Sequence, residues 1–196
     1  MLTHLAVLHS RLDVLSKPCP VPQASGVYAW FFNRIPQNVP TDGCVTKDQK
    51  TLLYVGISPD KVGKPNSKQN LRKRITNHYR GNAEGSTLRR SLGILLATES
   101  DFPLRRIGSG NRMTCTHLGE QWLDRWMEEN AFVSWTEHAT PWKLEDELLQ
   151  TLSLPLNIKG NQDHIFSSTL NQSRKAAIRN ARSNPVARED NLQRQM

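Results

Sequence analysis

The sequence has little cysteine, no long apolar run and a local shortage of acidic residues. Among its 196 residues only Cys19, Cys44 and Cys115 are cysteines, with no C-x-x-C pair, which argues against a structural zinc site and favours a reducing compartment. No apolar run approaches the roughly 18 residues that a membrane span requires. Charged and histidine side chains interrupt the start of the chain, which therefore lacks the apolar centre of a signal peptide. We expect a soluble, cytoplasmic protein.

The shortage of acidic residues is confined to one segment. The chain has 26 Lys and Arg against 18 Asp and Glu, which gives a formal net charge of +8. Residues 61–90 hold nine of the basic residues and only Glu84, so this segment accounts for the whole excess. Lysine and arginine release counterions when they contact phosphates, and a segment of this kind favours a phosphate-facing surface over a merely solvated stripe. The residues expected to contact a nucleic-acid backbone are Lys61, Lys64, Lys68, Arg72, Lys73, Arg80, Arg89 and Arg90.

Periodicity and turn residues predict an α+β fold with a small antiparallel sheet of three strands flanked by helices. The expected strands are 26–32, 51–57 and 131–135, and the expected helices are 3–16, 70–79, 87–97, 118–130 and 141–153. A Pro-rich connection follows the first helix, and the chain beyond Gly160 is polar and basic. We therefore divide the chain into an N-terminal helix with its connection (1–24), a core domain (25–160) and a C-terminal extension (161–196).

The last core helix carries three consecutive carboxylates, which helical geometry separates. Its apolar face is formed by Leu144, Leu148, Leu149 and Leu152. At about 100° per residue, Glu145 lies roughly 35° from the centre of that face, whereas Asp146 and Glu147 lie far from it. A carboxylate that points toward a core needs a partner. A metal ion and a buried arginine are both compatible with Glu145.

The basic helix has an apolar stripe with an arginine on each side. Arg74 and His78 lie one turn apart on one edge, and Arg72 lies on the opposite edge. A planar guanidinium contacts two phosphate oxygens at once, which lysine cannot reproduce. Geometry does not choose between the two arginines, and a hydrogen-bonded structural histidine remains an alternative for His78.

Two tripeptides on the first two strands carry a family resemblance. Gly26-Val27-Tyr28 and Tyr54-Val55-Gly56 resemble the paired signature of the GIY-YIG endonuclease superfamily, with Val in place of Ile in both. Arg74 with His78, then Glu145, then Asn157 occur in the order of the family's arginine, metal-binding glutamate and asparagine. The Arg-x-x-x-His spacing is similar to that of a branch with several restriction endonucleases. The resemblance spans about residues 25–157.

The resemblance implies a metal-dependent DNA endonuclease that uses Mg²⁺ or Mn²⁺. Water would be activated near Tyr28 with help from His78, and the phosphate would be held by Arg74 and by metal on Glu145. One carboxylate suffices for Mg²⁺, because water and phosphate oxygens complete its shell. Tyr54 would donate a supporting hydrogen bond. Gly26 and Gly56 would permit close packing of the backbone beside the site, and Asn157 would support the site structurally.

Two other interpretations use the same basic segment without catalysis. The chain would then be a nucleic-acid-binding module, or a scaffold for an acidic protein. For the nuclease, the sequence contains no separate targeting domain, and phosphate contacts do not read sequence. Selection of duplex or branched DNA would therefore come from loops, insertions or assembly as a homodimer. No role is assigned to residues 98–130.

Overall fold

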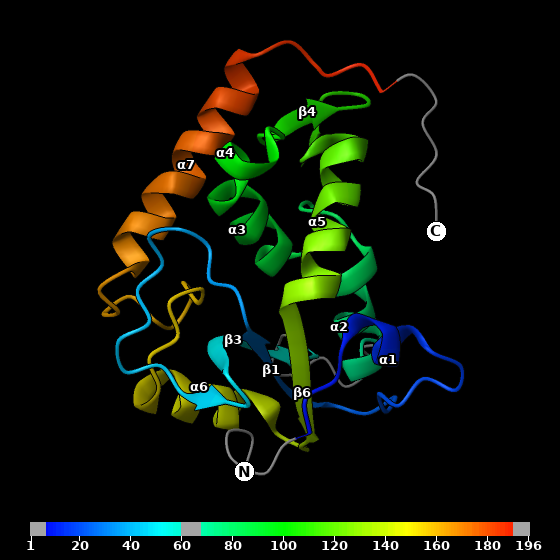
Figure 1. Ribbon diagram of the computed structural model, residues 1–196, viewed down its shortest axis with the longest axis vertical. Coiled ribbons are helices and arrows are strands. Elements are labelled where there is room, and N and C mark those ends of the chain that lie inside the picture. The colour runs from blue at the N-terminus through cyan, green and yellow to red at the C-terminus, as the bar shows by residue number, and fades with distance from the viewer. Residues whose placement is uncertain (1–6, 60–67, 190–196) are drawn as a thin grey trace.

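A computed structural model describes residues 7–59 and 68–189 of the chain (Figure 1). Within these ranges the strands are β1 (Gly26–Phe32), β2 (Thr46–Lys47), β3 (Lys50–Ser58), β4 (Arg105–Ile107), β5 (Arg112–Thr114) and β6 (Ala131–Glu137). The helices are α1 (Arg11–Leu15), α2 (Leu71–Arg80), α3 (Thr87–Leu95), α4 (Ala97–Ser100), α5 (Thr116–Asn130), α6 (Pro141–Thr151) and α7 (Ser167–Ser183). The α+β class predicted from the sequence is confirmed.

The main sheet is antiparallel and has the strand order β2-β3-β1-β6. Strand β1 is fully buried and pairs along its whole length with both neighbours, β3 and β6. The prediction of three strands was one short, because β2 adds a two-residue fourth strand at the edge of β3. A strand of two residues carries no hydrophobic period, so periodicity does not identify it.

Helices cover both faces of this sheet (Figure 1). Tyr28, Trp30 and Phe32 point into a core with residues of α2, α3 and α5. Alternate residues of β1 point the other way, where the leucines of α6 cover them. Strand β3 contains a bulge, because Trp30 pairs with Tyr54 while Phe31 pairs with Leu52. Helix α6 therefore lies on the opposite face of the sheet from Tyr28.

The predicted starts of three helices, at residues 70, 87 and 141, agree with the structure to within one residue. The Asn70 side chain accepts a hydrogen bond from the Lys73 N–H at the start of α2. Ser86 caps α3 in the same way by accepting from the Arg89 N–H at 3.1 Å. Pro141 occupies the first turn of α6, where its missing N–H leaves no bond unmade. The local signals thus determine where three helices begin.

The N-terminal helix is shorter than predicted. Ser10 and Asp13 form a capping box, so α1 begins only at Arg11. His9 is extended and exchanges backbone hydrogen bonds with Val133 at the edge of β6. The predicted helix of residues 3–16 is therefore wrong over its described part before Arg11, because pairing with the sheet edge takes His9. Residues 1–6 lie outside the described residues.

The segment 98–130 contains the small hairpin of β4 and β5 and the long helix α5. The hairpin was not predicted, since its strands are short and rich in arginine. Helix α7 packs against α3 and β4, and Figure 1 shows it running beside α3. None of the described helices has the length and apolar character to cross a membrane.

Candidate active site

The ring of Tyr28 lies over Gly56, its cross-strand partner in β3. A Cβ at position 56 would lie 2.5 Å from the Tyr28 hydroxyl oxygen and 2.7 Å from Cζ, so a side chain there would displace the ring. At the same end of β1, a Cβ on Gly26 would collide with the carbonyl oxygen of Thr136 and with Leu71. The two glycines therefore let β1 approach its neighbours and set the position of the Tyr28 hydroxyl.

A chain of hydrogen bonds runs from Tyr28 through His78 to Ser86. The Tyr28 hydroxyl lies 2.9 Å from His78 Nε2, and His78 Nδ1 lies 2.7 Å from Ser86 Oγ. All three side chains are buried. Burial lowers the pKa of His78 well below its usual value, and the nearby charges of Arg74 and Arg89 lower it further. The imidazole is therefore neutral at pH 7 and accepts a proton at only one of its nitrogens.

Arg74 projects from α2 to the same hydroxyl. Its Nε donates a hydrogen bond to the Tyr28 oxygen at 3.3 Å. Burial first, and the adjacent Tyr54 second, raise the pKa of Tyr28 far above its usual range, and Arg74 offsets this only in part. Tyr28 is therefore a neutral phenol that contacts a guanidinium and a neutral imidazole at once.

Tyr54 occupies the adjacent position on β3, close to the start of α3. The side chain of Thr87 lies near its hydroxyl and acts on it as a hydrogen-bond donor. Burial raises the pKa of Tyr54, whereas the Thr87 bond and the charges of Arg74 and Arg174 lower it. Two arginines from different helices therefore act on one phenol.

Glu145 lies on the side of α6 that faces the sheet. It is partly buried, whereas Asp146 and Glu147 are exposed, as the helical geometry predicts. Its carboxylate charge acts on Tyr28 and on Tyr54, raising the pKa of both hydroxyls. The carboxylate is thus near enough to both phenols for its charge to act on them, although most of α6 packs on the other face of the sheet.

A hard divalent cation fits this arrangement of oxygen atoms. Glu145 supplies a carboxylate beside two hydroxyl groups, and Mg²⁺ is commonly bound by one or two carboxylates with water completing the shell. Among residues 7–59 and 68–189 there is no group of three or more His, Cys, Asp and Glu that could enclose a metal ion. The fit is therefore to an ion held by one carboxylate together with water and a substrate.

Asn157 joins the segment after α6 to strand β3. Its Oδ1 accepts from the Val55 N–H and its Nδ2 donates to the Val55 carbonyl, both at 2.9 Å. The adjacent Leu156 N–H donates to the carbonyl of Leu53. The amide is buried, and its two bonds hold the backbone between Tyr54 and Gly56. Asn157 therefore supports the geometry of the site through the backbone at the edge of β3.

The predicted DNA-contacting residues have different surroundings. Lys61 and Lys64 lie outside the described residues. Exposed side chains are those of Lys68, Lys73 and Arg80. Arg72 is partly buried, and its Nε donates to the Val21 carbonyl at 2.6 Å in the Pro-rich connection. Arg90 is partly buried and pairs with Glu84 at 3.1 Å.

Arg89 contradicts its predicted contact with DNA. The side chain is 0% exposed and forms ion pairs with Glu120 and Asp124, both at 2.7 Å. Further N–H groups of the guanidinium donate to the carbonyls of His78, Tyr79 and Glu120. A phosphate could reach this guanidinium only if the core opened. The basic count of the segment did not distinguish this buried charge from exposed ones.

Three further residues belong to this region and were not predicted to act in it. Ser86 directly precedes the predicted helix 87–97, and its contact with His78 was not predicted. Thr87 bonds Tyr54, and Arg174 reaches the same hydroxyl region from α7. Ser86 and Thr87 are residues commonly found at the start of a helix, so the sequence does not indicate that they also contact His78 and Tyr54. Arg174 lies about 80 residues beyond the end of α3 in the sequence, so its position depends on tertiary packing.

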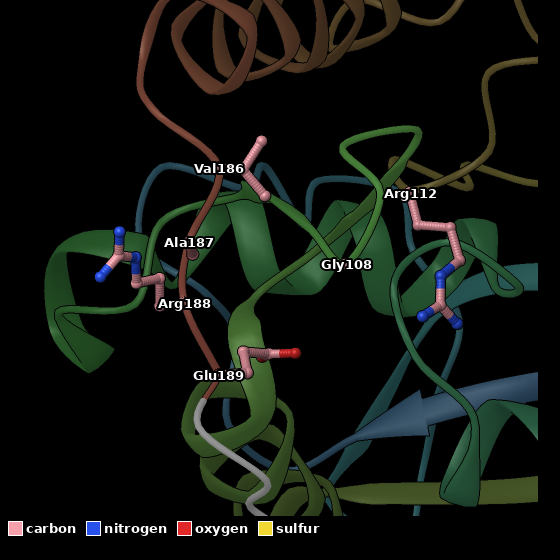
Figure 2. A pocket seen from close by; sticks show the side chains of 6 residues that line it. All are labelled: Gly108, Arg112, Val186, Ala187, Arg188 and Glu189. Carbon is pink, nitrogen blue, oxygen red and sulfur yellow. The ribbon is translucent and has the colours of Figure 1, made fainter.

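A separate surface pocket lies elsewhere in the molecule. It encloses about 430 Å³ and is lined by Gly108, Arg112, Val186, Ala187, Arg188 and Glu189. Figure 2 shows that the guanidinium groups of Arg112 and Arg188 extend away from each other. None of the residues around Tyr28 lines this pocket. Its arginines therefore do not converge on one ligand, and it is not part of the candidate active site.

Comparison with known proteins identifies one family. A family model described as the GIY-YIG catalytic domain matches residues 26–176, which include both tripeptides, the candidate residues on α2 and α6, and more than half of α7. No curated protein is significantly similar to the chain, and neither is any solved structure.

Proposed function

Since the chain belongs to the GIY-YIG family of catalytic domains and its function is therefore of the nuclease type, we propose that it is a metal-dependent endonuclease that hydrolyses phosphodiester bonds of DNA. The observation that carries the proposal is the Tyr28 hydroxyl, which contacts Arg74 on one side and His78 on the other. Such a hydroxyl lies between a group that binds phosphate and a group that accepts a proton.

Tyr28 and His78 would share the proton of the attacking water. As the water gives a proton to the Tyr28 oxygen, the phenol passes its own proton to His78 Nε2 at 2.9 Å. This direction requires the His78 proton on Nδ1, which then donates to Ser86 Oγ. The relay explains how a phenol with a raised pKa assists the reaction without forming a free phenolate in the resting protein.

Arg74 would bind a non-bridging oxygen of the scissile phosphate and stabilise the charge that develops there. The water oxygen bonds to phosphorus as the bond to the leaving oxygen breaks, and that oxygen takes a proton from solvent. Glu145 would hold Mg²⁺ or Mn²⁺, which supplies charge neutralisation on the phosphate when bound. Tyr54, held by Thr87, would donate a hydrogen bond to the phosphate or to water.

The exposed side chains Lys68, Lys73 and Arg80 would contact the DNA backbone beside the site. These contacts increase affinity but do not read sequence. Lys61 and Lys64 precede them in the same basic segment and are assigned the same role from the sequence alone.

The test uses purified protein with duplex, branched and single-stranded DNA, each with Mg²⁺ or Mn²⁺. We expect wild type to cut at least one substrate and Glu145→Gln to lose about 100-fold or more of that activity. Asp146→Asn is the matched control, because it removes the neighbouring carboxylate on the exposed side of α6 and leaves cleavage unchanged. Salt-sensitive binding without cleavage by wild type would instead identify a nucleic-acid-binding module.

A further inference from the structure

Helix α7 has one packed face and one basic exposed face. Leu170 and Ala181 are fully buried, and α7 contacts α3 and β4 along this side. Arg174 follows Leu170 by one helical turn and shares its face, so the guanidinium is directed toward α3. Lys175 and Arg179 lie on the other face and are exposed. Arg174 is thus a partly buried charge on the packed side of a surface helix.

The surroundings of Arg174 are those of the candidate active site. Its charge acts on the Tyr54 hydroxyl, which also contacts Thr87 at the start of α3. Arg90, one turn further along α3, is its positive neighbour. Burial, followed by the charge of Arg90, lowers the pKa of Arg174. Its guanidinium therefore interacts electrostatically with a phenol and with a second arginine.

No anion of the protein neutralises this charge within residues 7–59 and 68–189. Arg174 forms no ion pair or hydrogen bond there, whereas Arg90 pairs with Glu84. Holding a guanidinium in a partly desolvated position beside a like charge is unfavourable unless an anion completes the site. A DNA phosphate is the anion that the proposed reaction brings to Tyr54.

Resting on the proposed nuclease function, we infer that Arg174 binds a backbone phosphate of the DNA strand beside the Tyr54 hydroxyl, so that α7 supplies a second guanidinium to the active site. Arg74 approaches the Tyr54 hydroxyl from α2, and Arg174 approaches it from α7, which packs against α3. Two guanidinium groups on different helices neutralise more of the phosphate charge than one and fix the strand in two directions. The family match extends to residue 176 and so includes Arg174.

The experiment compares Arg174→Ala, Arg174→Lys and Lys175→Ala in the full chain. Lys175→Ala removes the same charge from the adjacent, exposed position of α7. We expect kcat/KM of Arg174→Ala to fall about 10- to 100-fold, the range for losing one hydrogen bond to a charged group. Arg174→Lys should recover part of this loss, and Lys175→Ala should change kcat/KM far less than Arg174→Ala.

Thermal unfolding and binding separate this role from a structural one. Because Arg174 has a like charge for a neighbour, we expect the Tm of Arg174→Ala to equal or exceed that of wild type. Binding of a fluorescent DNA duplex in EDTA, where no cleavage occurs, should weaken, and its salt dependence should decrease by about one phosphate contact.

Equal kcat/KM for Arg174→Ala and Lys175→Ala would overturn the inference while leaving the nuclease function intact. A Tm loss that accounts for the activity loss would overturn it as well, because Arg174 would then serve the fold. Absence of cleavage by wild type is a different result, since it would refute the proposed function itself. In that case the binding arm alone decides whether Arg174 contacts phosphate.

Discussion

The two sides of α3 hold arginine in opposite ways. On the side toward α5, the guanidinium of Arg89 is enclosed by Glu120 and Asp124 and has no exposed surface. On the side toward α7, Arg174 lies beside Arg90 and Tyr54, and no carboxylate of the described ranges bonds to it. A charge that the fold neutralises itself serves stability, whereas a charge left for an outside anion serves binding. Composition alone counts both as basic residues.

His78 lies where the two regions meet. Its ring faces Tyr28 in the candidate active site, and its carbonyl accepts a hydrogen bond from Arg89. Changes on the Arg89 side should therefore act mainly on stability, and changes on the Tyr28 side mainly on catalysis. The following experiments test that separation.

Arg89→Ala should give the largest effect. It leaves Glu120 and Asp124 without their buried partner, and we expect the free energy of unfolding to fall by about 3–5 kcal/mol. Chemical denaturation measures the loss. Adding Glu120→Gln removes one stranded charge and keeps an oxygen for the N–H groups of Ala83 and Cys115, so the double variant should lose less than the sum. A loss under about 1 kcal/mol for Arg89→Ala would erase the difference between the two sides.

Gly56→Ala should act on the other region. The new Cβ would overlap the Tyr28 ring and move its hydroxyl from His78 and Arg74. We expect cleavage to fall about 100-fold, with a loss of about 1–3 kcal/mol in unfolding free energy. Gly85→Ala is the control, since a Cβ there has its nearest neighbour at 3.6 Å and should leave both measurements unchanged. Equal behaviour of the two variants would contradict the close packing of Tyr28 on Gly56.

The pH dependence of stability tests the buried state of His78. In the unfolded chain an imidazole binds a proton below about pH 6.5, whereas burial keeps His78 neutral in the folded protein to a much lower pH. Below about pH 6.5 the unfolded state therefore binds more protons than the folded state. The contribution of His78 to the free energy of unfolding is fully present above about pH 6.5, and it falls as the pH decreases, by at most about 1.4 kcal/mol per pH unit. His78→Gln removes this contribution. Denaturation curves of wild type and variant that decline in parallel from pH 7 to 5 would show that His78 is protonated in both states.

Arg90→Ala should give the smallest effect. Its ion pair with Glu84 is partly exposed, and such pairs contribute less than about 1 kcal/mol. The change also removes the like charge beside Arg174. We therefore expect a change in unfolding free energy of under about 1 kcal/mol, in contrast to the neighbouring Arg89→Ala. A destabilisation as large as that of Arg89→Ala would mean that arginines on the two sides of α3 contribute equally to stability.

The sequence predicted the parts of the fold that local chemistry controls. Strand β1 has the bounds that its aromatic and β-branched residues indicate, and α2 and α3 begin within one residue of the predicted starts. The orientation of Glu145 followed from helical geometry alone. These features need no knowledge of distant residues.

Features that depend on distant packing were missed. The two residues of β2 become a strand only because β3 lies beside them. The burial of Arg89 depends on Glu120 and Asp124, which belong to another helix, and a sequence count cannot pair them. The same holds for Arg174, which belongs to a segment that the sequence characterises only as polar and basic. The roles proposed for Tyr28, Tyr54, Arg74, His78 and Glu145 rest on the family resemblance and stay predictions until the variants are measured.

The pairing of Asn157 with Val55 also affects how the molecule meets other chains. A single side chain occupies the donor and the acceptor that a further strand would use at this edge of β3, and Leu156 takes the position beside it. At the opposite edge of the sheet, the backbone of His9 occupies the donor and the acceptor of Val133. An edge with satisfied backbone groups is a poor template for strand addition, so the sheet is protected from edge-to-edge aggregation at both of these positions.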